Sequence, residues 1–205
     1  MPGRVVAAFD FDGTLSTRDN VLPFLATVAG RAAVAASLAR ALPDLTRGRR
    51  DAVKARLARD LLSGRDERET LALAERFAAD CRAEHLRADV LERATWHRDE
   101  GHERVIVSAS FECYLGPIAS ALGFDAALGT RLESAAGRLT GALDGPNVRR
   151  AEKVRRLDAW LGLGAGDAEI WAYGNSAGDR ELFARAAHPV RVGRSRISPE
   201  PPRPS

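Results

Sequence analysis

The chain has 205 residues, and 45% of them are hydrophobic, which suits one medium-sized domain with a substantial core or one domain carrying an insertion. Its 31 basic and 28 acidic residues leave a formal net charge of +3. That mild excess does not indicate a nucleic-acid partner, and no basic stripe with interleaved aromatic residues appears. No apolar run is long enough to span a membrane.

The amino terminus and the cysteines bear on location. Met1-Pro-Gly-Arg4 runs directly into an apolar stretch and lacks the layout of a secretory signal peptide. The two cysteines, Cys81 and Cys113, have no spacing typical of a metal site, so buried reduced thiols are expected. We therefore expect a cytoplasmic protein without a transmembrane segment.

The first predicted element is a buried strand that ends in two carboxylates. Residues 5–9 (VVAAF) are continuously apolar, and Asp10-Phe-Asp12-Gly13-Thr14 follows. At strand periodicity the two aspartates point to the same side. Two carboxylates this close require a cation, a shared proton or free solvent. A polar turn after a strand is the simpler interpretation of this motif alone, so the rest of the chain must decide.

The next seventy residues are predicted to be helical. Apolar residues recur at helical spacing, for example Val53, Leu57 and Leu61, and no strand pattern interrupts them. The first of these helices is expected to end at Pro43. Because a simple crossover between strands needs far fewer residues, we expect residues 18–86 to form an inserted helical cap.

From residue 87 onward, strands and helices alternate. Short apolar runs at 104–107, 125–128, 169–173 and 189–192 are separated by helical segments, and 130–143 is typical of a hairpin. This alternation predicts an α/β fold with a Rossmann-like parallel sheet. Residues 1–17 and 87–193 would form that core. Residues 194–205 hold four of the ten prolines and are expected to be a disordered tail.

Polar residues follow three of the predicted strands. Asp10 and Asp12 follow the first, Ser108 and Ser110 the second, and Asn175 a later one. Since the carboxyl ends of parallel strands share one edge of the sheet, these residues are expected to form one site. Ser110 is interpreted separately, as the N-cap of the helix that begins near Phe111.

Four motifs in this order resemble those of the haloacid dehalogenase superfamily of phosphohydrolases. They are Asp10-Phe-Asp12-Gly-Thr-Leu, Val107-Ser108-Ala-Ser110, Lys153 early in a helix, and Tyr173-Gly-Asn175-Ser-Ala-Gly-Asp179. The helical insertion between the first two motifs is similar to the cap of the phosphoserine-phosphatase-like branch, subfamily IB. The motifs together bracket residues 5–185.

The resemblance implies a role for each acidic residue and a cofactor. Asp10 would be the nucleophile that forms an aspartyl-phosphate, and Asp12 the general acid and base. Mg²⁺ would be held by the Asp10 side chain, the Asp12 backbone carbonyl and Asn175, with Asp179 holding the metal's water molecules. Many members have aspartate where this chain has Asn175, which removes one charge from the metal site.

The resemblance also implies the contacts to the phosphoryl group. Ser108 and the neighbouring Ala109 would bind a phosphoryl oxygen, and Lys153 would offset the negative charge. The substrate would be a small phosphorylated metabolite, and phosphoserine is one possibility.

Substrate choice would depend on the cap. Asp19 stands nine residues after Asp10, where phosphoserine phosphatases have an acidic residue that binds the substrate amine. Arg56 or Lys54 would bind the carboxylate. A phosphotransferase, a phospholipid-headgroup phosphatase and a non-catalytic phosphate-binding protein remain alternatives.

Overall fold

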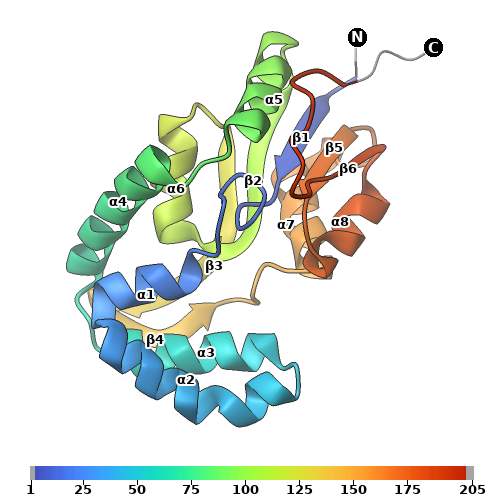
Figure 1. The fold of residues 1–205 in the computed structure, drawn as a ribbon. Helices are drawn as coiled ribbons and strands as arrows, with labels where there is room; N and C mark the ends of the chain where they lie inside the picture. Colours follow the sequence, from blue (N-terminus) through green and yellow to red (C-terminus); the bar gives the residue numbers. More distant parts are fainter. Residues whose placement is uncertain (1–2, 202–205) are drawn as a thin grey trace.

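The protein is built on one six-stranded sheet, which Figure 1 shows in a computed structural model that describes residues 3–201. The strand order is β4-β3-β2-β1-β5-β6, and every neighbouring pair is parallel except β3 and β4. The strands span Val5–Phe9 (β1), Glu103–Phe111 (β2), Ala126–Ala135 (β3), Arg138–Asp144 (β4), Glu169–Gly174 (β5) and His188–Arg191 (β6). The expected α/β fold with a Rossmann-like sheet is confirmed.

Both faces of the sheet are buried, which explains why its central strand is continuously apolar. Val6 and Ala8 pack against one layer, and Ala7 and Phe9 pack against the other. The first layer contains α7 (Ala151–Leu161) and α8 (Arg180–Arg185), and the second contains α5 (Ala88–Asp99) and α6 (Glu112–Ala121). Figure 1 shows the two layers on either side of β1.

Four helices between β1 and α5 form the cap. They are α1 (Val21–Ala29), α2 (Arg31–Thr46), α3 (Arg50–Leu62) and α4 (Glu67–Glu84). The predicted first helix is in fact two, because Gly30, at φ +87°, separates α1 from α2. The predicted end at Pro43 is also wrong, since α2 continues through Pro43 for one more turn. Within residues 3–201, no helix combines the length and apolar character needed to cross a membrane.

The β3–β4 hairpin extends from the core sheet and supports the cap. The Gly64 N–H, in the turn between α3 and α4, donates to the Leu139 carbonyl at 2.8 Å, and the Leu139 N–H donates to Arg65 at 2.9 Å. Gly141 lies so close to α3 that a Cβ there would stand 2.9 Å from the Cα of Arg59. Backbone contacts of this kind thus hold the cap against the hairpin.

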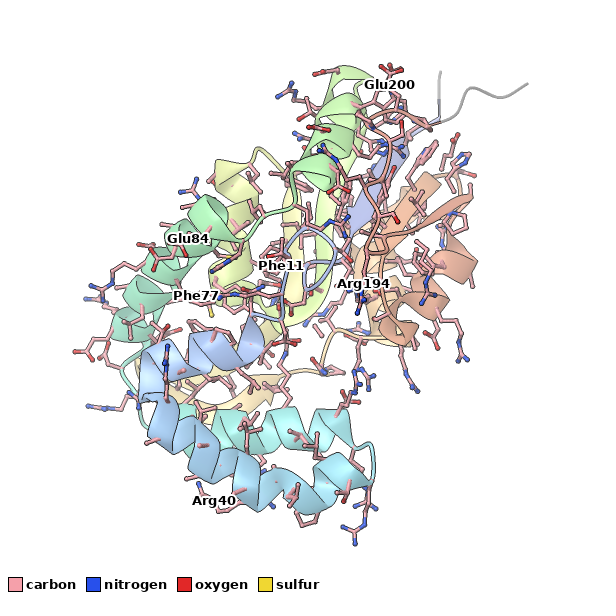
Figure 2. All side chains as sticks on the ribbon, in the orientation of Figure 1. Phe11, Arg40, Phe77, Glu84, Arg194 and Glu200 are labelled. Carbon is pink, nitrogen blue, oxygen red and sulfur yellow. The ribbon has the colours of Figure 1, made fainter. Side chains whose placement is uncertain are left out.

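An aromatic cluster also joins the cap to the core. The ring of Phe24 on α1 lies 5.5 Å from that of Phe77 on α4 and 5.0 Å from that of Tyr114 on α6. Phe11, from the loop after β1, points into the same interior and is fully buried (Figure 2). Burial of several aromatic side chains on both sides of the boundary fixes the cap against the sheet.

The carboxyl-terminal segment differs from the predicted disordered tail. Arg93 on α5 donates to the carbonyls of Ser198 at 2.6 Å and Pro199 at 2.8 Å, and the Ile197 N–H donates to Asp89 at 2.9 Å. Figure 2 shows Glu200 beside α5. These contacts place residues 197–199 against α5, whereas the prediction was of a disordered tail, and its last four positions, 202–205, lie outside the described residues.

Candidate active site

The two aspartates of the first motif lie where β1 ends. The Asp10 N–H donates to the Tyr173 carbonyl at 2.8 Å, which continues the pairing of β1 with β5 by one residue. The chain then turns, with Gly13 at φ +72° and the Ser16 N–H bonded to the Phe11 carbonyl at 2.8 Å. The turn holds both carboxylates at the carboxyl edge of the sheet, where β1 has β2 and β5 as neighbours.

Lys153 lies between two buried carboxylates. Its Nζ is 2.7 Å from Asp10 Oδ1 and 2.5 Å from Asp179 Oδ1, and all three side chains are nearly inaccessible to solvent. Burial lowers the pKa of Lys153, but the two carboxylates outweigh it and raise that pKa above its usual value. Burial raises the pKa of Asp10, and Lys153 opposes the rise. The ammonium group thus orients Asp10 through one oxygen.

Asp179 is a positioning residue for the lysine and for the loop after β5. Its second oxygen, Oδ2, accepts hydrogen bonds from the Asn175 N–H at 3.2 Å and from the N–H and hydroxyl of Ser176 at 3.0 and 2.9 Å. It caps the short 3₁₀ helix Ala177–Asp179 in this way. Both oxygens of Asp179 are therefore occupied by protein donors, which differs from the expected role of holding water on a metal.

Two residues that the sequence analysis did not assign to the site hold Asp12. The Ser110 hydroxyl donates to Asp12 Oδ2 at 2.6 Å, and the N–H and side-chain amide of Asn20 donate to Oδ1 at 3.0 and 2.8 Å. Burial raises the pKa of Asp12 to about 7, with Asp19 adding to the rise and the two donors opposing it. A carboxyl group with that pKa can both give and take a proton near neutral pH.

The interpretation of Ser110 as a helix N-cap is wrong. Strand β2 continues through Phe111, so Phe111 precedes the first residue of α6 and Ser110 remains in the strand. Ser108, two residues earlier, lies on the same side and accepts the Ser110 N–H at 3.2 Å. The strand periodicity of two brings both hydroxyls to the carboxylates.

A cavity of about 690 Å³ joins these groups between core and cap. Its lining includes predicted site residues from every motif and from the cap, namely Asp10, Asp12, Asp19, Ser108, Ala109, Lys153 and Asn175. Asp19 lies at the start of the cap, where its Oδ1 accepts the Val21 N–H at 3.0 Å. The structure thus brings together the four motifs and Asp19 in one place.

Of the two cap residues expected to bind a substrate carboxylate, Lys54 and not Arg56 contacts a residue of the site. Lys54 is buried, its Nζ contacts the Ala109 carbonyl, and it donates to Asn147 Oδ1 at 3.0 Å. Burial lowers its pKa to about 7, although Asp12 and Asp19 oppose that effect. Among the described residues, Arg56 does not line the cavity, and its Nε is buried without a hydrogen-bond partner. The assignment of Arg56 as a substrate-binding residue is not supported by its position.

Asp10, Asp12 and Asn175 line the cavity together with Gly13. Carboxylate, carbonyl and amide oxygens are the ligand atoms that a hard divalent cation such as Mg²⁺ prefers, so these residues could hold one. The Asn175 side chain packs so closely on Gly13 that any Cβ at that position would overlap it. Over residues 3–201, no cluster of three or more histidine, cysteine or carboxylate side chains forms an alternative metal site.

The fold and the site are those of an α/β enzyme with a helical cap, and comparisons with known proteins identify its family. The model of the haloacid dehalogenase-like hydrolases matches residues 7–184. The chain is 37% identical to protein CicA of Caulobacter vibrioides over 196 residues, covering 89% of this chain and 83% of that protein. It is 29% identical to a phosphoserine phosphatase of Halobacterium salinarum over 192 residues, covering 91% and 85%.

A solved structure shares the same architecture. A protein of unknown function from Bordetella pertussis Tohama I superposes with a TM-score of 0.79 at 27% identity, over 92% of this chain and 90% of that one. The chain belongs to the haloacid dehalogenase-like hydrolase family. The four motifs predicted this family, and the position of the helical insertion predicted the similarity to phosphoserine phosphatases that the comparison shows.

Proposed function

We propose that the protein is a magnesium-dependent phosphomonoesterase that works through an aspartyl-phosphate on Asp10. This proposal rests on the different environments of two carboxylates, Asp10 and Asp12. Asp10 is oriented by Lys153 through one oxygen, and Asp12 has a pKa of about 7 and faces the same cavity. Separation of two carboxylates into different environments is the usual basis for separating a nucleophile from an acid and base.

The proposed reaction has two displacements at phosphorus. The free oxygen of Asp10 attacks the phosphoryl group, the ester P–O bond breaks, and Asp12 gives its proton to the leaving alcohol oxygen. Asp12, now ionised, takes a proton from water, which attacks the acyl phosphate and releases inorganic phosphate and Asp10. The Ser108 hydroxyl and the Lys153 ammonium group stabilise negative charge on the phosphoryl oxygens.

The residues beside Gly13 would hold the metal. Mg²⁺ bound by Asp10, the Asp12 carbonyl and Asn175 would supply positive charge next to the transferred phosphoryl group. An amide at position 175 contributes an oxygen without charge, so this site is one charge less negative than a site with aspartate there. The metal requirement is tested by activity and thermal stability with added Mg²⁺ or with chelator.

The substrate is proposed to be a small phosphorylated metabolite. The cavity lies between the core and the cap, and its lining from the cap side includes Asp19 and Arg50. A relative that acts on phosphoserine supports this class without identifying the compound. A panel of phosphorylated metabolites, assayed for phosphate release, would identify the preferred leaving group.

The experiment that tests the proposal compares the wild-type protein with Asp10→Asn. The wild type is expected to release phosphate from p-nitrophenyl phosphate in the presence of Mg²⁺, and Asp10→Asn is expected to release none while keeping its circular dichroism spectrum. Undiminished turnover in the variant would overturn the mechanism. Transfer of the phosphoryl group to an added alcohol would identify a phosphotransferase, and inactivity of the wild type at every metal concentration would favour a binding protein.

A further inference from the structure

The lining of the active-site cavity is rich in arginine. Four of them contribute to it: Arg18 after β1, Arg50 at the start of α3, and Arg149 and Arg150 before α7. With Lys153 they give five basic residues in the lining, against Asp10, Asp12 and Asp19. The chain as a whole is nearly balanced, with 31 basic and 28 acidic residues. The positive excess is thus concentrated at the site.

Three of these four guanidinium groups have no carboxylate partner among the described residues. Within the described part of the chain, Arg18, Arg50 and Arg150 have no acidic side chain within 4.0 Å, and Arg149 has only Asp51, at 3.7 Å. Arg149 is also the least exposed, with 19% of its side chain accessible. Unpaired guanidinium groups around a cavity favour an anion, because each offers several N–H donors in a fixed planar arrangement.

Arg150 is held in place by an unusual backbone conformation. Its φ is +52° and its ψ is −128°, a combination that residues with a Cβ rarely adopt. The Arg150 N–H donates to the Gly178 carbonyl at 2.9 Å, so the strained residue is tied to the loop after β5. Strain of this kind persists only where the surrounding structure enforces it, and it is frequent at functional sites.

The acidic side of the cavity is poorly suited to a substrate amine. Among the described residues, Asp19 is the one acidic lining residue besides the two of the first motif, and one of its oxygens already accepts the Val21 N–H. Arg18 precedes it directly and lines the same cavity. An ammonium group bound at Asp19 would share the cavity with the Arg18 guanidinium group, which reduces its attraction to this side of the cavity.

We propose that the leaving group of the substrate carries a second anionic group, a phosphate or a carboxylate, and no amine. Arg50, Arg149 and Arg150 bind this second anion between cap and core while the reacting phosphoryl group lies at Asp10. This inference rests on the proposed function for the first phosphoryl group and specifies the rest of the molecule. Because Arg50 belongs to the cap and the other two to the core, such a substrate would also bridge the two parts.

A matched two-carbon series tests the charge preference. Phosphoglycolate and ethylene glycol bisphosphate carry a second anion, ethyl phosphate carries no further charge, and phosphoethanolamine carries an amine. The value of kcat/KM is expected to be about tenfold or more higher for the two anionic compounds than for ethyl phosphate, because a hydrogen bond to a charged group contributes that much. Phosphoethanolamine is expected to be the poorest. Equal values of kcat/KM across the series would overturn the second-anion site without contradicting the phosphatase activity.

Substitution of the arginines tests whether they cause the preference for a second anionic group. Arg149→Gln and Arg150→Gln are each expected to reduce the ratio of kcat/KM for phosphoglycolate to that for ethyl phosphate by about tenfold. Arg98→Gln is the matched control, because Arg98 is 59% exposed on the last turn of α5 and pairs with Asp99. An unchanged ratio in both test variants would contradict the assignment, and circular dichroism checks that each variant is folded.

A binding measurement separates this inference from the proposed function. Calorimetric titration of the wild type and of Asp10→Asn with phosphoglycolate and with ethyl phosphate does not need turnover. Tighter binding of phosphoglycolate without any hydrolysis would support the anion site and overturn the hydrolase. Equal binding of the two compounds would overturn the anion site whether or not hydrolysis occurs.

Discussion

Ser110 donates its hydroxyl to the Asp12 carboxylate at 2.6 Å and so joins the end of β2 to the loop after β1. The bond opposes the effect of burial, which raises the pKa of Asp12 to about 7. Asp12 is thus held at a pKa that suits proton transfer in both directions. The serine acts on the reaction through Asp12.

Replacement of Ser110 by alanine is expected to raise the pKa of Asp12 further. Loss of a hydrogen bond to the charged form disfavours ionisation, by about one pKa unit. The limb of the pH–rate profile that Asp12 sets should move to higher pH by that amount. The profile is measured for the wild type, Ser110→Ala and the exposed control Ser120→Ala, and a limb that does not move in Ser110→Ala would exclude this role.

Replacement of Lys153 by methionine is expected to destabilise the protein and abolish turnover. Asp10 and Asp179 would be left buried without their cation, at a cost of about 3–5 kcal/mol in the free energy of unfolding. The loss should be largest at neutral pH and smaller in acid, where the unpaired carboxyl groups become protonated. Denaturant unfolding at several pH values measures it. Arg155→Met, a 61% exposed position on the same helix, should show little change.

Replacement of Gly13 by alanine is expected to weaken the response to Mg²⁺. The added Cβ would overlap the side-chain amide of Asn175, and it would stand at φ +72°. Gly30→Ala provides the matched control, because Gly30 has a similar φ of +87° but nothing within 4 Å of a Cβ. Both variants should lose about 1 kcal/mol or more of stability from backbone strain. Only Gly13→Ala should need more Mg²⁺ for half-maximal activity, and equal requirements in the two variants would argue against a metal site at Asn175.

His97 is expected to make stability fall in acid. Burial lowers its pKa from 6.5 to about 3, with His102 and Arg93 adding to the effect. Arg93 donates to the Tyr173 hydroxyl at 3.0 Å, and that hydroxyl lies 2.8 Å from His97 Nε2, where it can donate a hydrogen bond to a neutral imidazole.

The direction in which stability changes with pH follows from proton uptake by His97. Between pH 6.5 and about 3, the unfolded chain protonates this histidine and the folded protein does not, so the free energy of unfolding declines as pH falls through that window. The maximum contribution is about 1.4 kcal/mol for each pH unit. His97→Gln should flatten this decline and His85→Gln should not. A curve for His97→Gln that parallels the wild type would show that other groups cause the acid sensitivity.

The ends of β1 and β5 and the order of the motifs could be predicted from the sequence because each is a local signal. The apolar runs that stop at Asp10 and Asn175 define these two strand ends, and parallel strands then bring them to one edge. The contacts of Ser110 and Asn20 with Asp12 could not be predicted in this way. They depend on how far β2 extends and on how the loop after β1 folds back over its own carboxylate.

The cap and the carboxyl-terminal segment show two further features that could not be predicted from the sequence. Lys54 and Arg56 are two residues apart, about 200° around a helix, so the rotation of α3 decides which one faces the site, and periodicity alone does not fix it. Residues 194–201 have the composition of a disordered tail, but Arg93 binds their backbone carbonyls. Composition cannot reveal an interaction that uses the backbone of one partner.

The central claim is that Asp10 becomes phosphorylated during turnover. The most direct measurement is an acid quench of the wild type in the steady state with the best substrate of the panel, followed by mass spectrometry of the peptides. The account predicts one added phosphoryl group on the peptide that contains Asp10, released by hydroxylamine and absent from Asp10→Asn. A phosphoryl group on another residue, or full turnover of Asp10→Asn, would contradict it.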